Sequence, residues 1–534
     1  MFFIFIKRNN NRVKIVLFIF IAIFAILIVR LFKLQLYPNT QVVSQMNTHQ
    51  TENVTDNDIV LLDTNNKELL SYKNKYIVVI DRKPFSLNNY ETTIEDLMAF
   101  NFIMKSELSN FNFTDVLNSN GKVYYQVSEE TYNKIKQLKN IKGVYEYTRQ
   151  DLTESEAGDI SSFLVKSVNS ANLVDGSLQS QIKKYTENNQ VTQENFYLDQ
   201  DSVYSIDELY QNDQNRKLQL TIDDNLQTKI YNLLNSSDYA QYKNIGVCLL
   251  ESNTGAIRAM VQKDKAQSNI NLGLEGSGFE PGSIFKLITY GSALEEGKIN
   301  PTDTFKCTGQ ICKVNHGILT VNSAFEKSCN DIFAQIGAKV SYKDLMGYAE
   351  KLGLYQRTLD IQGETTGIEP KESDGINNIS IGQCSTVSPI QMVSATNAIV
   401  NDGVYVKPYL IQNVLNNDNN IVTAIKPEKN RVFSKTTSDI LKTGMDNVVL
   451  NGTGKEAKIP NIKIGGKTGS ATTNDKKTHA WFTGYFVYNN KTYTMIVFVP
   501  NIEGKDKNGE DLGGGNTAAP IFAEIVKKIM QNNR

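Results

Sequence analysis

Histidine, cysteine and tryptophan are scarce in this sequence of 534 residues, which contains three His, five Cys and one Trp. Three histidines make a multi-histidine metal site hard to build, and five cysteines are too few for a disulfide scaffold in a chain of this length. The sequence also lacks an excess of charge of either sign, since 56 Lys and Arg face 57 Asp and Glu. A near-neutral chain is a poor polyanion binder, so we expect no nucleic-acid partner.

Long apolar runs are absent too, with one exception near the start. Residues 15–29 are apolar without a break, and two further apolar residues follow Arg30. Fifteen helical residues span about 22 Å, and with Lys14 and Arg30 reaching outward the segment approaches the ~30 Å hydrocarbon core of a bilayer. No small-x-small cleavage site follows, so we expect residues 15–33 to be an uncleaved transmembrane anchor rather than a signal peptide.

Basic residues lie unevenly around this segment. Two follow it, Arg30 and Lys33, and four precede it, namely Lys7, Arg8, Arg12 and Lys14. By the positive-inside rule, residues 1–14 form a cytoplasmic tail and everything from about residue 34 onward lies outside the cytoplasm. One span and a hydrophobic content of 40% indicate a single-pass membrane protein with a large extracytoplasmic part.

The extracytoplasmic side of a cell is oxidising, which bears on the cysteines. Cys307 and Cys312 are five positions apart in a glycine-containing loop. They could form a small disulfide or stay two free thiols, and the sequence favours neither. Cys248 and Cys384 have apolar neighbours in the sequence, so we expect both in the core.

The part beyond the anchor divides in two. Residues 34–216 are rich in Asn, Ser, Thr, Lys and Glu, with short β-like runs and amphipathic helical stretches between them. No catalytic constellation occurs there, and we expect a mixed α/β spacer, or pedestal. From residue 217 the pattern changes to strand-like runs at both ends of the segment and helical patterns in between.

Within residues 217–534, two strand-like runs come early, at 244–251 and 256–261, and three come late, at 462–470, 478–488 and 492–499. This spacing predicts an antiparallel sheet whose strands are far apart in the sequence, covered by helices. The expected fold class is α+β, in one domain large enough to bury a full core.

The first motif that carries chemistry is Ser-Ile-Phe-Lys at residues 283–286, directly after a Pro-Gly breaker. Ser283 and Lys286 are one helical turn apart on the same face. A serine at a helix N-terminus lies beside free backbone N–H groups, and a partly desolvated lysine can lose its proton and act as a base. Taken alone, the motif is more often an N-capping serine followed by a surface lysine.

The second motif is Ser-Cys-Asn at residues 328–330, which precedes a predicted helix. The hydroxyl of Ser328 could relay a proton, and the amide of Asn330 could hold a carbonyl group and orient a lysine. Taken alone, this motif is more often a turn that caps the helix.

The third motif is Lys-Thr-Gly-Ser at residues 467–470, in a predicted strand. Small residues there let a substrate come close, and a cation, two hydroxyls and a strand edge suit a peptide carboxylate and β-pairing with a peptide. The same tripeptide recurs at residues 442–444, inside the helical pattern 436–450. Its side chains would fan around a helix, so we assign this second copy no role.

Penicillin-binding proteins and class A β-lactamases use these three motifs in this order, and the chain resembles a class B penicillin-binding protein, a peptidoglycan D,D-transpeptidase. The resemblance covers residues 217–534 and includes Ala-Trp-Phe-Thr-Gly-Tyr at 480–485. It is poor in the spacer, where residues 63–66 read Asp-Thr-Asn-Asn instead of Asp-Arg-Asn-Gly. It implies a penicillin-binding/β-lactamase-like transpeptidase domain, an antiparallel sheet flanked by helices, on a mixed α/β pedestal with one N-terminal transmembrane helix.

The resemblance also implies a role for each motif residue. Ser283 would be the nucleophile that forms an acyl-enzyme, and Lys286 its base. Ser328 would pass the proton to the leaving group, and Asn330 would hold the substrate amide and the lysine. The substrate-binding residues would be Lys467, Thr468, Gly469 and Ser470. Ser470 replaces the more usual threonine and keeps the hydroxyl. No metal or organic cofactor is expected.

The implied partners are peptidoglycan stem peptides, β-lactams, the cell membrane through the N-terminal helix, and a glycosyltransferase or another wall-synthesis protein. Two other functions remain open. A D,D-carboxypeptidase keeps all three motifs and passes the acyl group to water instead of an amine. A divergent, non-catalytic cell-wall scaffold is the main alternative that is not an enzyme.

Overall fold

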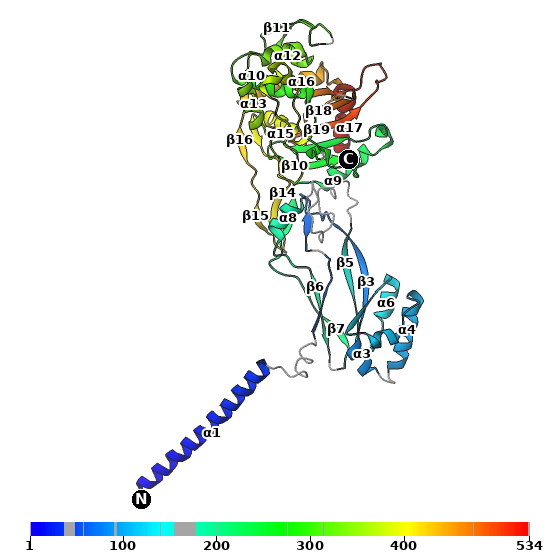
Figure 1. The fold of residues 1–534 in the computed structure, drawn as a ribbon, viewed down its shortest axis with the longest axis vertical. Helices are drawn as coiled ribbons and strands as arrows, with labels where there is room; N and C mark the ends of the chain where they lie inside the picture. Colours follow the sequence, from blue (N-terminus) through cyan, green and yellow to red (C-terminus); the bar gives the residue numbers. More distant parts are fainter. Residues whose placement is uncertain are drawn as a thin grey trace. The chain divides into compact units, whose positions relative to one another are not determined.

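The computed structural model describes residues 2–36, 49–56, 58–89, 93–138, 140–153, 178–199, 201–274, 276–312, 314–473 and 475–531. The chain divides into two compact units (Figure 1). The first contains Met1–Asp56, Lys73–Asp151 and Val191–Asn212, and the second contains Asn57–Tyr72, Leu152–Gln190 and Asp213–Arg534.

Helix α1 (Phe2–Leu36) begins the chain. Within the described ranges, it is the one helix long and apolar enough to cross a membrane, over Lys14–Lys33. Its apolar side chains are exposed, as Phe18 and Phe20 illustrate. The helix therefore contains the predicted anchor at residues 15–33.

The rest of the first unit contains two three-stranded sheets, of strand order β1-β6-β7 and β4-β3-β5. The strands are β1 (His49–Asn53), β3 (Ser71–Asp81), β4 (Lys122–Val127), β5 (Val144–Thr153), β6 (Gln193–Leu198) and β7 (Tyr204–Tyr210). The helices are α3 (Arg82–Asn88), α4 (Ile94–Glu107), α5 (Phe113–Asn118) and α6 (Glu129–Ile135). Ile80 of β3 shares a buried cluster with Phe100 and Met104 of α4, so helices cover the second sheet.

The second unit is built around a five-stranded antiparallel sheet of order β10-β9-β19-β18-β17 (Figure 1). Its strands are β9 (Gly246–Glu251), β10 (Ala256–Gln262), β17 (Ile464–Thr472), β18 (Thr478–Tyr488) and β19 (Lys491–Ile502). Strand β19 pairs with β9, so that Tyr493 lies opposite Glu251. The sheet thus joins two early strands to three late ones, as the sequence predicts.

Helices cover both faces of this sheet. Side chains alternate between the faces of a strand, and on β19 Met495 and Val497 share a buried cluster with α9 (Asp224–Leu234) and α17 (Ala519–Met530). Ile496 and Phe498 alternate with them along the strand. They belong to a second buried cluster, which includes residues of the helices between β10 and β17. The sheet therefore lies between two helical layers, which fits the predicted α+β class.

The segment between β10 and β17 supplies most of the second helical layer. Its helices are α10 (Lys286–Glu295), α11 (Val321–Glu326), α12 (Asn330–Gly337), α13 (Tyr342–Lys351), α14 (Ile376–Ile379), α15 (Pro389–Val400) and α16 (Lys435–Leu450). Smaller strands are β11 (Thr304–Cys307), β12 (Gly317–Thr320), β13 (Val404–Val406), β14 (Ile411–Leu415), β15 (Ile421–Ala424) and β16 (Lys429–Arg431).

The second unit also includes segments that the sequence analysis assigned to the spacer, 34–216. Strand β2 (Val60–Leu62) pairs in parallel with β8 (Lys217–Leu220), and Leu61 is buried in the main core cluster. Helix α8 (Gln179–Thr186) packs into the same cluster through Ile182. The second compact unit therefore includes short segments of the predicted spacer together with residues 217–534.

The positions of the cysteines show that one prediction is wrong, and they decide between a disulfide and free thiols for Cys307 and Cys312. Cys384 is exposed, so its assignment to the core is wrong. It has a φ of +63° and lies between α14 and α15, and the apolar neighbours that suggested burial belong to the flanking segments. Cys248 is buried in β9, as predicted, and Cys307 and Cys312 are both free thiols.

Candidate functional site

Ser283 lies in a short 3₁₀ turn, Gly282–Phe285, that leads into α10. A first turn of 3₁₀ type replaces the α-helical start that the sequence suggested. Gly282 has a φ of +54°, and a Cβ there would lie 2.6 Å from the carbonyl oxygen of Ser470. Only glycine tolerates both constraints. The turn therefore brings the half-buried Ser283 against strand β17.

Lys286 is fully buried and converges on the other motif residues. Its Nζ lies 3.1 Å from Ser283 Oγ, 2.5 Å from Asn330 Oδ1 and 2.7 Å from the carbonyl oxygen of Ser328. The last two atoms can only accept hydrogen bonds, so they take two N–H groups of the amine. The rest of the nitrogen faces two hydroxyls, those of Ser283 at 3.1 Å and Ser328 at 3.3 Å.

The same burial changes the protonation of Lys286. Desolvation disfavours the ammonium form and lowers the pKa of Lys286 to about 7. A sizeable fraction of neutral amine is then present near neutral pH. A neutral amine in this position can accept the proton of Ser283, which is the requirement for a general base.

Ser328 lies in the turn between α11 and α12 and has a φ of +55°, which is rare for a residue other than glycine. Backbone hydrogen bonds hold the turn, from Ser328 N to the Phe325 carbonyl at 3.1 Å and from Cys329 N to the Ala324 carbonyl at 2.9 Å. The Ser328 hydroxyl lies 3.3 Å from Lys286 Nζ and 2.9 Å from Lys467 Nζ. It therefore lies between two amines, in a position to relay a proton.

Lys467 is the second fully buried amine, on strand β17. Burial lowers the pKa of Lys467 well below its usual value, and the nearby Lys286 lowers it further by repulsion. Within the described part of the chain, no ion pair connects either lysine to a carboxylate. Protonation of one of them would therefore leave an uncompensated positive charge that favours an anionic ligand.

The other residues of the third motif line the same strand. Gly469 lies against the 3₁₀ turn, since a Cβ there would lie 2.9 Å from the carbonyl oxygen of Pro281. Thr468 Oγ1 lies 2.6 Å from Thr453 Oγ1, and the exposed Ser470 accepts a hydrogen bond of 3.0 Å from the Gly514 amide. Strand β17 is an edge strand of the sheet, so its outer side can accept a peptide.

Trp481, Thr453 and Gly514 also support the site, and the roles of Thr453 and Gly514 were not predicted. Trp481 Nε1 donates a 3.0 Å hydrogen bond to the carbonyl oxygen of Glu280, which holds the chain just before Ser283. Thr453 is in a turn after α16, and Gly514 begins the π-helical turn Gly514–Ala518 that leads into α17. No local sequence pattern signals that they contact β17, because their contacts depend on the tertiary fold.

The second Lys-Thr-Gly copy is elsewhere, as predicted. It is in helix α16, where Lys442 pairs with Asp402 at 2.6 Å and with Asp439 at 3.0 Å. Neither partner belongs to the site. The copy therefore offers a matched control for Lys467.

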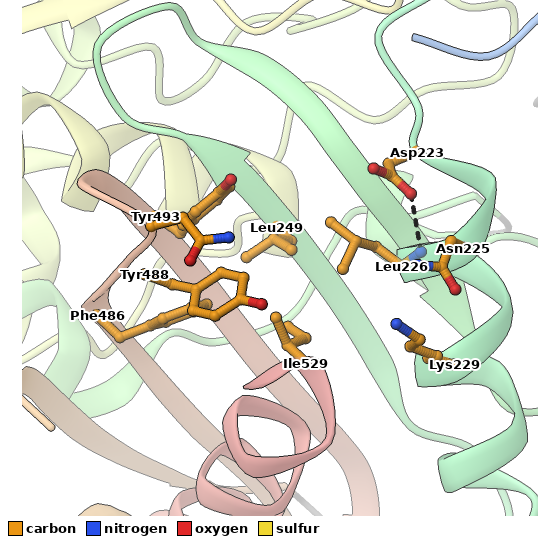
Figure 2. Close-up of a pocket in the computed structure, with 10 residues that line it drawn as sticks. Asp223, Asn225, Leu226, Lys229, Leu249, Phe486, Tyr488, Tyr493 and Ile529 are labelled. Carbon is orange, nitrogen blue, oxygen red and sulfur yellow. Dashed lines mark hydrogen bonds between the residues drawn. The ribbon is translucent and has the colours of Figure 1, made fainter. Parts of the chain in front are cut away.

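A cavity of about 270 Å³ lies among α9, β9, β18, β19 and α17 (Figure 2). Asp223 and Lys229 are among the residues that line it, and Asp223 caps α9 by accepting a hydrogen bond from Leu226 N. None of the predicted site residues lines this cavity. It brings together no nucleophile and base, so it is not a second catalytic candidate.

Comparison with known proteins identifies the motif-bearing part of the chain. Residues 245–527 match the family described as the penicillin binding protein transpeptidase domain. Stage V sporulation protein D of Bacillus subtilis is 30% identical over 351 residues, which are 58% of this chain and 53% of that protein. Penicillin-binding protein PbpB of Mycolicibacterium smegmatis is 27% identical over 357 residues, 59% of this chain and 54% of that protein. The chain thus spans about half the length of the curated relatives it matches.

Solved structures of similar fold cover most of the chain. A peptidoglycan synthetase from Bifidobacterium adolescentis has a TM-score of 0.66 at 18% identity, over 90% of this chain and 96% of that one. Penicillin binding protein 3 from Mycobacterium tuberculosis, solved in complex with ampicillin, has a TM-score of 0.62 at 18% identity, over 90% and 96% of the two chains. These likenesses confirm the predicted fold class.

Proposed function

The chain belongs to the penicillin-binding protein transpeptidase family, as predicted, and on that premise we propose that it is a peptidoglycan D,D-transpeptidase working through an acyl-enzyme on Ser283. One observation carries the proposal. The buried amine of Lys286 lies 3.1 Å from the Ser283 hydroxyl, and two of its N–H groups are taken by the Ser328 carbonyl oxygen and Asn330 Oδ1. This arrangement suits an amine that removes the serine proton.

In the first step, Ser283 Oγ attacks the carbonyl carbon of the penultimate D-Ala of a stem peptide. The serine proton passes to Lys286 Nζ. The backbone N–H groups of Ser283 and Ser470 stabilise the negative oxygen that forms, and losing one such donor typically costs about 10²–10³-fold in kcat. The placement of the 3₁₀ turn against β17 supports this pairing of the two amides.

In the second step, the C–N bond to the terminal D-Ala breaks. Its nitrogen takes a proton from the Ser328 hydroxyl, which Lys286 reprotonates, so that the terminal D-Ala leaves with a neutral amine. The amine of a second stem peptide then attacks the ester carbon, the bond to Ser283 Oγ breaks, and the proton of the attacking amine returns to Oγ through Lys286. A β-lactam acylates Ser283 in the same way, but its ring nitrogen stays attached.

Strand β17 is the element on which the substrate would bind. A stem peptide can pair with the edge of the strand through main-chain hydrogen bonds. Thr468 and Ser470 supply hydroxyls for the terminal carboxylate, and the negative charge of that carboxylate favours the protonated form of the buried Lys467. Asn330 holds both the substrate amide and Lys286.

We also propose the arrangement of the chain around the membrane. Helix α1 would anchor the protein with residues 1–14 in the cytoplasm, because basic residues are more frequent before the apolar segment than after it. The pedestal, 34–216, and the transpeptidase domain, 217–534, would then lie outside, where stem peptides and a glycosyltransferase or another wall-synthesis protein are accessible.

The reaction is tested with the full chain in detergent micelles, a stem-peptide donor, and an amine acceptor that is either present or omitted. We expect cross-linked product when the acceptor is present. Release of D-Ala alone under both conditions would identify a carboxypeptidase. Neither product, together with no labelling by a fluorescent penicillin, would favour a scaffold.

The pH dependence of acylation tests the base. We expect the second-order rate of acylation of Ser283 by a β-lactam to rise as pH increases through about 7 and then to level off. The reason is that only the neutral amine accepts a proton, and burial lowers the pKa of Lys286 to about 7. Stopped-flow measurements from about pH 5 to about pH 8 check this, and a rate that is flat or falls over this range would contradict the assignment.

The two Lys-Thr-Gly copies allow a matched test of the third motif. We expect Lys467→Met to slow acylation by about 10²–10³-fold, the typical effect of losing one preorganised electrostatic group. Lys442→Met, which changes the same tripeptide on the surface of α16, should leave the rate unchanged. If the two substitutions change the acylation rate equally, Lys467 has no specific role in acylation.

A further inference from the structure

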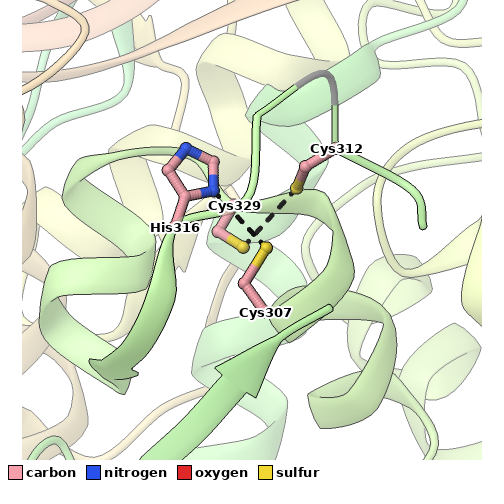
Figure 3. Close-up of side chains that lie close together, drawn as sticks. All are labelled: Cys307, Cys312, His316 and Cys329. Carbon is pink, nitrogen blue, oxygen red and sulfur yellow. Dashed lines mark hydrogen bonds between the residues drawn. The ribbon is translucent and has the colours of Figure 1, made fainter. Parts of the chain in front are cut away.

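Four side chains that the proposed mechanism does not use converge close to the Ser328 turn (Figure 3). Cys307 ends β11, Cys312 lies in the loop that follows, His316 directly precedes β12, and Cys329 directly precedes α12. One donor atom from each residue lies within 4.8 Å of all the others. Three sulfurs and one imidazole nitrogen therefore surround a common centre.

The spacing of these atoms suits a tetrahedral metal ion. Cys312 Sγ is 3.6 Å from Cys329 Sγ, and Cys307 Sγ is 3.6 Å from His316 Nδ1. Zinc bonds of about 2.3 Å to sulfur and about 2.0–2.1 Å to nitrogen, at tetrahedral angles, separate two sulfurs by about 3.8 Å and a sulfur and a nitrogen by about 3.6 Å. A disulfide would instead need sulfurs about 2.05 Å apart.

The surroundings also suit thiolate ligands. The backbone amide of Asp331 donates to Cys312 Sγ at 3.4 Å, and the amides of Gly309 and His316 donate to Cys307. Such N–H groups stabilise the negative charge of a metal-bound sulfur. Cys307 and Cys329 are fully buried, whereas Cys312 and His316 are only half-buried, which gives an ion a path into the site.

The loop that supplies two of the ligands is fixed to α12 by contacts outside the cluster. The Thr308 hydroxyl donates to Asp331 Oδ2 at 2.6 Å, and Gln335 Nε2 donates to the carbonyl oxygen of Lys306 at 2.9 Å. The four ligands therefore come from segments that already pack together. Little rearrangement is needed to bind an ion, which lowers the entropic cost of assembly.

We propose that Cys307, Cys312, His316 and Cys329 bind one Zn²⁺ in a closed, tetrahedral, structural site. Soft thiolates with one imidazole favour zinc over calcium or magnesium. Each of the three thiols releases its proton to solvent as it binds, so the filled site carries a net charge of −1. All four positions are taken by protein ligands, so the ion takes no direct part in chemistry.

The position of Cys329 gives the ion a structural task. Cys329 lies between Ser328 and Asn330, and Ser328 has the unusual φ of +55°. A backbone in this region persists only where its surroundings hold it. Zinc bound to Cys329 would anchor the turn and so keep both neighbours against Lys286.

Metal content is the direct test. The full chain, purified in detergent with a reducing agent and dialysed against buffer with equimolar Zn²⁺, should hold about one zinc per chain by elemental mass spectrometry. Cys312→Ser and His316→Ala should lose most of this zinc. Cys384→Ser, at an exposed cysteine outside the cluster, should keep it. Cys312 and His316 are chosen because half-buried positions tolerate these changes better than Cys307 does.

Two results would overturn the site. One is wild-type protein that binds no zinc under reducing conditions. The other is peptide mapping of the untreated protein that finds a disulfide among the three cysteines. Cobalt supplies a second readout on the wild-type chain, because a tetrahedral thiolate site gives Co²⁺ strong visible and charge-transfer absorption. Weak absorption typical of octahedral Co²⁺ would also contradict the proposal.

The proposed anchoring of the Ser328 turn by zinc is tested by a separate measurement. Removing the metal with a chelator should lower the melting temperature and slow the labelling of Ser283 by a fluorescent penicillin, and added Zn²⁺ should restore both. Metal-free protein that is labelled at the wild-type rate would overturn the anchoring of the Ser328 turn. Zinc-loaded protein that is never labelled would count against the proposed transpeptidase and leave the metal site intact.

Discussion

Ser283→Ala protein is expected to form no covalent adduct with a fluorescent penicillin and to make no cross-linked product. The substitution removes the only atom that the proposed mechanism acylates, so the loss should reach the detection limit of the assay. Ser283 is half-buried, and its hydroxyl lies at hydrogen-bonding distance from Lys286. The variant should therefore keep its fold. Gel fluorescence after denaturation measures the adduct, and a melting curve verifies folding.

Ser292→Ala is the matched control for this experiment. Ser292 is on the same helix, α10, where its hydroxyl donates to the Thr289 carbonyl at 3.1 Å and contacts none of the site residues. This variant should be labelled like the wild type. A label that survives on Ser283→Ala, or that maps to another residue, would refute the assignment of the nucleophile.

Lys286→Met is expected to slow acylation by about 10²–10⁴-fold, the usual contribution of a positioned general base. Methionine fills a similar volume without an amine, so the effect should come from lost chemistry more than from a cavity. The rise of the rate through pH 7 should disappear at the same time. A purely structural role of Lys286 would lower the rate but leave that rise in place.

Lys298→Met supplies the comparison, since Lys298 is exposed just beyond the end of α10. It should match the wild type in rate and in pH profile. Time-resolved labelling with a fluorescent β-lactam at several pH values gives both quantities. A wild-type pH profile in the Lys286→Met protein would require a different base.

The five-stranded sheet could be predicted because its strands have clear boundaries. The early hairpin has a turn signal at residues 252–255, and the late strands are long apolar runs separated by polar turns. It was harder to predict which segments belong to each of the two compact units. Strand β2 is only three residues long, and its pairing with β8 depends on a contact between segments about 150 residues apart. Local patterns carry no information about such a partner.

The candidate site shows the same contrast. Ser283, Lys286, Ser328, Asn330 and Lys467 are recognisable because each motif is short and contiguous, and the structure brings these residues to hydrogen-bonding distance. The cluster of three cysteines and one histidine was not predicted, because only metal sites made of several histidines were considered. Its ligands are spread over 23 positions from Cys307 to Cys329, and only the docking of the 307–316 loop on α12 brings them together.

The pairing of β19 with β9 has a consequence for how the chain folds. Lys491 of β19 and Glu251 of β9 are 240 residues apart. At a synthesis rate of about 5–20 residues per second, an early strand waits roughly 10–50 s for its neighbour to exist. Through that interval β9 is paired with β10 on one edge only, and its other edge lacks its final partner, so the nascent domain depends on protection from aggregation. A chain that ends before residue 491 should therefore be degraded instead of giving a partly active enzyme.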